Sequence, residues 1–154
     1  MKMKYYLLPV VFLLAIASTG FGQSTYVKKY KKLADSLSRV YQIPTGVILG
    51  IAILESGSGQ SKNCRLLNNH FGIVGKNNLL QTKGIKTRYK QYSSNEASFY
   101  DFVRVVSGKK YYAALKGNPS CRAWIVEMSK HGYSEVPGEW VKNVMGVING
   151  QKLQ

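Results

Sequence analysis

Glu55 is the carboxylate whose surroundings in the sequence could give it acid chemistry. It follows an almost wholly apolar run from Val47 to Leu54, which predicts a helix buried on nearly all sides. Gly57 and Gly59 end that helix, so the Glu55 carboxyl meets partial desolvation and the negative end of the helix dipole. Both effects raise the pKa of a carboxyl. A carboxyl that stays protonated near neutral pH can act as a general acid, for example toward the leaving oxygen of a glycosidic bond. The alternative is an exposed glutamate at a helix end, the usual state for this residue type.

The elements that must position Glu55 are mostly helices. Apolar residues recur at helical spacing between residues 26 and 41, and Pro44 suits the first position of the buried helix that runs to about Glu55. Ser93 and Glu96 have the spacing of a capping box and predict the start of another helix. Further helical patterns cover residues 109–115, 120–131 and the stretch from Trp140 to Ile148. The fold class expected is mainly α.

A small β-hairpin is expected beside these helices, which makes the predicted class α+β. Residues 79–92 alternate apolar and basic side chains around Lys83 and Gly84, a dipeptide that fits a tight turn. Residues 64–75, rich in asparagine and glycine, predict a shaped loop.

The first 23 residues have the pattern of a signal peptide. Lys2 and Lys4 precede an apolar stretch over residues 5–17, and small residues follow it. The apolar stretch is short for a bilayer span of roughly 20 residues, so we expect no stable membrane insertion after its removal. Residues 24–154 then suffice for one compact domain, which we expect to be exported to the periplasm, the cell envelope or the extracellular space.

The net charge of +15 predicts an attraction to polyanions. Nucleic acid and anionic cell-envelope polymers offer similar electrostatics, and a basic surface that only aids solubility is a further alternative. Export favours the envelope polymers, so nucleic acid is not the expected partner.

The two cysteines, Cys64 and Cys121, leave two states open. Export would place them where a disulfide persists, but nothing in the sequence requires one. A zinc site drawing on them with His70 and His131 lacks the close ligand spacing that structural zinc sites favour. No metal and no cofactor are expected.

Two strings in the chain resemble glycoside hydrolase family 73, the peptidoglycan N-acetylglucosaminidases of the flagellar-assembly and autolysin type. They are residues 53–61, Ile-Leu-Glu-Ser-Gly-Ser-Gly-Gln-Ser, and residues 68–73, Asn-Asn-His-Phe-Gly-Ile. The likeness continues through residues 92–99 and weakly through residues 132–134. It implies a lysozyme-like helical fold and hydrolysis of β-1,4 bonds in peptidoglycan on the N-acetylglucosamine side.

The resemblance also implies a set of site residues. Glu55 matches the family's general acid, and Tyr133 matches a tyrosine near the catalytic centre. An Asn-x-Phe-Gly loop can offer an amide to sugar hydroxyls and an aromatic face to a pyranose ring. The substrate-binding residues expected on this basis are Ser56, Asn69, His70, Phe71 and Tyr92. For the loop the alternative is internal support, with a buried Phe71 and an asparagine that bonds its own backbone.

One departure from the family bears on the mechanism. Residues 76–95 contain no Asp or Glu, although some family members place a second carboxylate on the hairpin. An ordinary inverting or retaining glycosidase needs two carboxylates. Three interpretations follow: attack by the substrate's own N-acetyl oxygen, which we prefer, activation of water by a distant carboxylate such as Glu135, or a binding module that does not cut. A lytic transglycosylase, which also works with a lone Glu, is the nearest enzymatic alternative.

Overall fold

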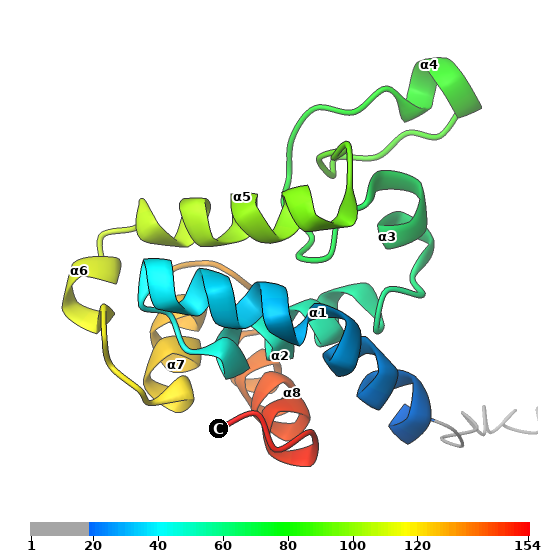
Figure 1. Cartoon of the computed structure of the whole chain (residues 1–154). Helices are drawn as coiled ribbons and strands as arrows, with labels where there is room; N and C mark the ends of the chain where they lie inside the picture. Colours follow the sequence, from blue (N-terminus) through cyan, green and yellow to red (C-terminus); the bar gives the residue numbers. More distant parts are fainter. Residues whose placement is uncertain (1–18) are drawn as a thin grey trace, which may run out of the picture.

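The structure is a computed structural model that describes the backbone of residues 19–154 and the side chains of residues 25–154, so residues 1–18 of the predicted signal peptide lie outside it. The described chain is a bundle of helices from which one long loop projects (Figure 1). The helices are α1 (Thr19–Tyr41), α2 (Thr45–Ser56), α3 (Lys62–Leu67), α4 (Leu79–Lys83), α5 (Asn95–Ser107), α6 (Tyr112–Leu115), α7 (Cys121–Lys130) and α8 (Pro137–Gly150). The prediction of a mainly helical domain is confirmed.

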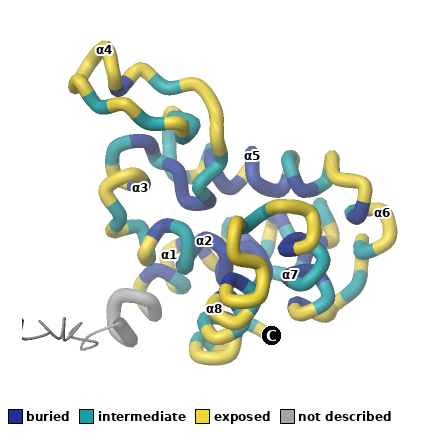
Figure 2. The backbone as a smooth tube through the Cα atoms, turned by 180° about the vertical axis from the view of Figure 1, so that it is seen from behind, coloured by how far each residue is buried: buried dark blue, intermediate teal, exposed yellow. Residues whose placement is uncertain are grey.

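Helix α2 lies at the centre of the bundle and packs against α1, α7 and α8. Its residues Val47–Ile53 are all buried, as the apolar run predicts, and Figure 2 shows this helix dark blue within the tube. The glycine at position 50 lets α8 approach closely, since a Cβ there would lie 2.5 Å from Cγ1 of Ile148. Gly46 faces the carbonyl of Leu153 in the same way, so α2 and α8 run antiparallel. This register brings the start of α8 to the end of α2, where Glu55 lies.

Stacked aromatic rings attach the 68–72 loop to α5. Phe71 lies parallel to Phe102 with ring centroids 4.1 Å apart, and Phe99 meets Phe71 edge to face at 4.9 Å. Tyr30 of α1 stacks on Phe99 with ring centroids 4.9 Å apart. All four side chains are buried, and the loop therefore has a rigid hydrophobic support.

The predicted β-hairpin is not formed, and that prediction is wrong. Residues 73–92, which we call the arm, project from the bundle as two extended legs joined by α4 (Figure 1). Gly84 ends α4 in the left-handed conformation, so the Lys83–Gly84 pair is a helix end, not a hairpin turn. Within residues 19–154 the sole bridge of β type joins Val74 and Tyr89. The side chain of Asn77 joins the legs further out, donating to the carbonyls of Thr87 and Tyr89.

A buried carboxylate fixes the base of the arm to α5. Asp101 accepts hydrogen bonds from Lys90 and Tyr92, each at 2.7 Å, and from Arg104. Burial would raise the pKa of Asp101, but these three donors outweigh it and lower the pKa to about 2. The arm therefore begins from a fixed point, although its outer part is largely exposed in Figure 2.

Two local expectations are corrected. The N-cap of α5 is Ser94, whose Oγ accepts from the backbone N–H of Ala97, so the predicted capping box at Ser93 is one residue out. Part of the loop predicted over residues 64–75 forms α3, which Ser61 caps. Cys64 and Cys121 are both free and buried in this structure.

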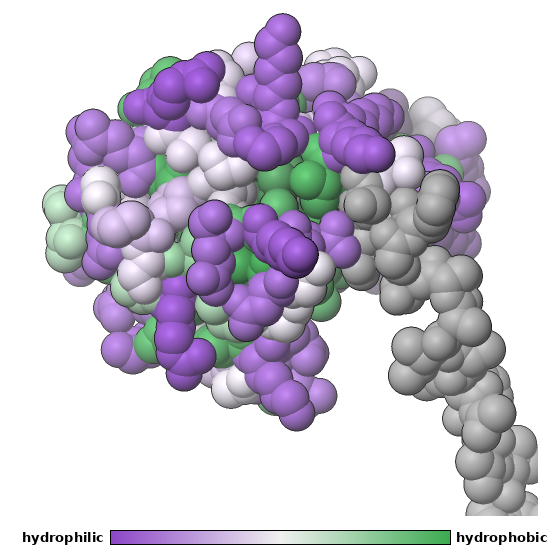
Figure 3. Space-filling model, turned by 60° about the horizontal axis from the view of Figure 1, so that its bottom comes forward, coloured by the Kyte–Doolittle hydropathy of each residue, from purple (hydrophilic) through white to green (hydrophobic). Residues whose placement is uncertain are grey.

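The surface fits the high net charge. The face shown in Figure 3 is mostly hydrophilic, with apolar side chains visible in hollows between the polar ones. No helix among the described residues is long and apolar enough to span a membrane.

Candidate active site

Glu55 lies in the last turn of α2, where the buried helix reaches the surface. Gly57 ends the helix in the left-handed conformation, and its N–H bonds back to the carbonyls of Ile53 and Leu54. Glu55 itself is partly buried. Its Oε1 accepts a hydrogen bond of 2.8 Å from Nε1 of Trp140, in the first turn of α8. One carboxyl oxygen is thus held by a residue 85 positions away in the chain.

The pKa of Glu55 is raised above its ordinary value. Burial is the largest cause, because desolvation disfavours the charged form, and the hydrogen bond from Trp140 opposes it without cancelling it. A raised pKa keeps more of the carboxyl protonated toward neutral pH, which is the state that a general acid needs.

The second oxygen of Glu55 faces an open cleft. A Cβ placed on Gly72 would lie 3.6 Å from Oε2 of Glu55, so the glycine leaves that side of the carboxyl uncovered. Within residues 25–154 no side-chain polar atom is both buried and without a partner, and no described donor bonds Oε2. Oε2 is therefore open to solvent, and to a substrate in the cleft.

The cleft measures about 580 Å³ and lies between the arm, the 131–136 segment and the first turn of α8. Its ring-bearing and charged lining residues are Glu55, Phe71, Arg88, Tyr89, Lys109, Tyr111, His131, Tyr133, Glu135 and Trp140. Glu55, Gly72 and Tyr89 also line a smaller hollow of about 120 Å³ with Ser61, Asn63 and Asn69. The groove therefore extends to both sides of the Glu55 carboxyl, as a chain-like substrate would require.

Tyr133 lies in the cleft close to Glu55. Its hydroxyl donates a hydrogen bond of 3.1 Å to the backbone carbonyl of Phe71, and its ring lies 5.0 Å from that of Trp140. The pKa of Tyr133 is raised well above its ordinary value by burial first and then by the nearby Glu55 carboxyl. The tyrosine therefore stays neutral and links the 131–136 segment to the 68–72 loop.

Asn69 and Phe71 shape the cleft from behind. The amide nitrogen of Asn69 donates to the carbonyls of Ile73 and Lys90, and its oxygen accepts from the N–H groups of Phe71 and Ile73. The side chain of Asn69 is buried, and its hydrogen bonds are made to the backbone of residues 71, 73 and 90. The ring of Phe71 is buried in the stack with Phe102. Both arrangements match the internal-support alternative.

The other three expected binding residues have buried side chains with internal partners. Ser56 donates to the carbonyl of Ala52 and accepts from the N–H of Gly59, so it fixes the turn after α2. Tyr92 bonds Asp101 at the base of the arm. His70 lies behind the loop and does not line the cleft. These residues support the cleft without lining it.

Among the cleft residues that were not expected from the sequence, three lie around the Glu55 carboxyl. Trp140 begins the helical pattern that runs to Ile148 and is buried, but its indole N–H also holds Glu55. Gly72 and Tyr89 flank the free carboxyl oxygen. The Asn-x-Phe-Gly string was a signal for Gly72, whereas nothing distinguished Tyr89 from the other tyrosines.

Glu135 lies in the same cleft as Glu55. Its carboxylate is 3.6 Å from the guanidinium of Arg88, and both side chains are well exposed, at 88% and 66%. This exposed pair joins the 131–136 segment to the arm across the cleft. Among the described residues there is no group of three or more His, Cys, Asp or Glu side chains that could hold a metal ion.

The family model for the glucosaminidases, described as mannosyl-glycoprotein endo-beta-N-acetylglucosaminidase, matches residues 31–153. The chain belongs to the glucosaminidase family. The match includes Glu55, the 68–72 loop, the arm and the cleft, so the family expected from the Glu-Ser and Asn-x-Phe-Gly strings is confirmed.

The glucosaminidase domain is similar to one curated relative and to solved structures. It is 25% identical over 142 residues to the peptidoglycan hydrolase FlgJ of Vibrio cholerae, covering 80% of this chain and 42% of that protein. The chain thus spans less than half the length of that relative.

Two solved structures have the same fold. The catalytic domain of the autolysin Auto from Listeria monocytogenes has a TM-score of 0.68 and 23% identity, over 90% of this chain and 89% of that one. A C-terminally truncated glycoside hydrolase domain of FlgJ from Salmonella typhimurium also gives 0.68, at 21% identity, over 86% and 99%. The expected lysozyme-like helical fold is confirmed, without the hairpin lobe.

Proposed function

We propose that this protein hydrolyses β-1,4 glycosidic bonds of peptidoglycan on the N-acetylglucosamine side, with Glu55 as the general acid. The observation that carries the proposal is the Glu55 carboxyl, held at Oε1 by Trp140 and open at Oε2 to a groove that extends on both sides. The glucosaminidase match and the similarity to a peptidoglycan hydrolase supply the substrate class. The signal-peptide pattern of residues 1–23 supports export to the periplasm, the cell envelope or the extracellular space, where this substrate is accessible.

The mechanism we propose is substrate-assisted. Glu55 gives its proton to the leaving glycosidic oxygen while the carbonyl oxygen of the N-acetyl group attacks the anomeric carbon and forms a cyclic oxazolinium ion. Water then attacks the anomeric carbon, the ring opens, and the Glu55 carboxylate takes up the proton of that water. This route needs one protein carboxyl. Tyr133, held against the loop carbonyl of Phe71, positions the acetamido group or the water.

Glu135 offers a different route, because it is the second carboxylate that lines the cleft. In that route it would activate water directly while Glu55 protonates the leaving group. Its pairing with Arg88 and its exposure fit better with a surface ion pair, which contributes little.

Replacing Glu135 by glutamine separates the two routes. We expect kcat for Glu135→Gln to stay within about threefold of wild type, since removing an essential general base costs about 10²-fold or more. Initial rates on soluble glycan strands measure this, with Glu139→Gln, an exposed carboxylate outside the cleft lining, as the control. A loss of 10²-fold for the Glu135 variant alone would assign the base to Glu135.

Digestion of purified peptidoglycan tests the activity itself. The fragments are reduced with borohydride and identified by mass spectrometry, and we expect reduced N-acetylglucosamine ends because the bond on that side is cut. Anhydro-muramic ends would instead identify a lytic transglycosylase. An absence of fragments, with the protein still sedimenting with the sacculus, would leave a glycan-binding module.

A further inference from the structure

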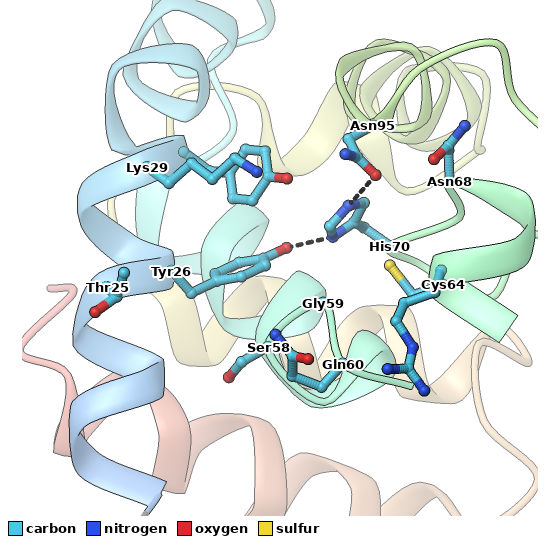
Figure 4. Close-up of a pocket in the computed structure, with 12 residues that line it drawn as sticks. Thr25, Tyr26, Lys29, Ser58, Gly59, Gln60, Cys64, Asn68, His70 and Asn95 are labelled. Atoms are coloured by element: carbon cyan, nitrogen blue, oxygen red, sulfur yellow. Dashed lines mark hydrogen bonds between the residues drawn. The ribbon is translucent and has the colours of Figure 1, made fainter. Parts of the chain in front are cut away.

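A second pocket, separate from the Glu55 cleft, lies between α1, the turn after α2 and α3. This α1–α3 pocket measures about 500 Å³. Figure 4 shows its centre: Tyr26, His70 and Asn95 stand in a row joined by two hydrogen bonds, with Lys29 and Gln60 to either side. None of the residues that line the α1–α3 pocket also lines the Glu55 cleft.

The centre of the pocket is rigid and uncharged. The hydroxyl of Tyr26 lies 2.6 Å from Nδ1 of His70, and Nε2 of His70 lies 3.0 Å from the side-chain oxygen of Asn95. The partners fit the neutral imidazole with its proton on Nε2, donating to Asn95 and accepting from Tyr26. Burial is the main reason why the pKa of His70 is lowered, so the ring stays neutral.

The two charged residues that line the pocket, Lys29 and Arg65, are both positive. Lys29 and Arg65 are exposed, and neither takes part in an ion pair with another described residue. The Lys29 ammonium lies over the ring of Tyr30 at 5.0 Å and no carboxylate lines the pocket. Glu96, the nearby acid, stands outside the lining at the start of α5. The two cations and the absence of a carboxylate from the lining therefore favour an anionic ligand in this pocket.

The neutral lining groups narrow the kind of anion. The side chains of Ser58 and Gln60 supply a hydroxyl and an amide that suit a peptide backbone. Asn68 adds its amide oxygen, since its amide nitrogen already donates to the carbonyl of Tyr92. A guanidinium matches a planar carboxylate with two parallel hydrogen bonds. Together these groups favour a short peptide that carries carboxylates over a bare phosphate chain.

The pocket is also within reach of the groove. Ser61 and Asn63 line the small hollow beside Glu55, while Gln60, Cys64 and Arg65 line the α1–α3 pocket, so the same turn and helix α3 separate the two. A helix is about 10–12 Å across, and an extended peptide covers about 3.3–3.6 Å per residue. A peptide of roughly three or four residues attached to a sugar in the groove spans that distance.

We infer that the α1–α3 pocket binds the carboxylate-bearing stem peptide of a peptidoglycan strand whose sugars occupy the Glu55 groove. The inference rests on the proposed function, because it names the part of the same substrate that this second pocket takes. Lys29 and Arg65 bind the carboxylates, and the neutral residues of the pocket bind the backbone.

The test compares two soluble substrates: glycan strands that keep their stem peptides, and strands whose stems an amidase has removed. For Lys29→Ala/Arg65→Ala we expect KM to rise about tenfold on the stem-bearing strands and to stay unchanged on the stem-free strands, with kcat unchanged on both. Lys28→Ala/Lys62→Ala is the matched control, because it removes equal charge from the same two helices at exposed positions outside the pocket. Melting temperatures verify that all variants are folded.

Calorimetry with the free stem peptide tests the pocket without catalysis. We expect binding to wild type that weakens about tenfold in the Lys29/Arg65 variant and when the carboxylates of the peptide are amidated. Equal effects of the two double variants, equal loss on both kinds of strand, or tighter binding of a glycerol phosphate oligomer than of the peptide would overturn the inference. If wild type cuts neither strand, the proposed hydrolysis fails, while the calorimetry still decides on the pocket.

Discussion

Glu55→Gln is expected to lower kcat on peptidoglycan strands by about 10²- to 10⁴-fold, the usual contribution of a general acid. Glutamine keeps the shape of the side chain, and its amide oxygen can still accept the hydrogen bond from Trp140. It cannot donate a proton to the leaving oxygen. Substrate binding should therefore persist, and a sedimentation assay with intact sacculi should give wild-type affinity. A variant that cuts at the wild-type rate would remove Glu55 from the mechanism.

The stability of the Glu55→Gln variant provides an independent check on the electrostatics. The folded-state pKa of Glu55 is raised, so the folded protein binds this proton more tightly than the unfolded chain does. The stability that goes with that proton is fully present below the ordinary pKa and is lost as pH rises through the raised value. Glutamine does not titrate. Near neutral pH the variant should therefore melt no lower than wild type, and below about pH 4 the two should converge.

The central helix and its acid could be predicted because both depend on local patterns. The apolar run of α2 has almost no polar face, so it had to be buried, and the glycines after Glu55 had to end it. The partner of Glu55 could not be predicted in this way. Trp140 fits an apolar stripe equally well whether or not its indole N–H donates a hydrogen bond. Its bond to Glu55 depends on the antiparallel register of α2 and α8.

The arm shows why alternation alone misled. Residues 85, 87 and 89 have the period of a strand, and extended legs satisfy that period without a ladder. A few backbone hydrogen bonds near the base of the arm and the amide of Asn77 join the legs, and Asn77 carries no sequence signal for that role. The family strings have a similar limit. They contain Glu55 and Gly72, which line the cleft, together with Ser56 and His70, which support it, and likeness alone does not separate the two kinds.

Gly72→Ala is expected to lower kcat/KM by about 10- to 100-fold, the second largest effect we predict. Gly72 has φ of +65°, and the added Cβ would lie 3.6 Å from Oε2 of Glu55, within ordinary contact distance. The methyl group therefore fits the folded protein but occupies the side of the carboxyl that the glycosidic oxygen must approach. A displacement of about 1 Å between reacting groups costs about 10²-fold. The left-handed backbone adds a stability cost of about 1–2 kcal/mol.

Gly84→Ala separates the backbone cost from the obstruction. Gly84 has φ of +66°, nearly that of Gly72, but a Cβ there would meet no atom within 4 Å. Thermal unfolding should show a similar loss of stability in both variants, while kcat/KM should fall for Gly72→Ala alone. If both variants lost activity equally, strain in the arm and loop would account for the loss. The space beside Oε2 would then not be where the glycosidic bond lies. The comparison thus locates the scissile bond relative to Glu55. Proton transfer to the glycosidic oxygen requires that bond to lie on the free side of the carboxyl, beside Oε2.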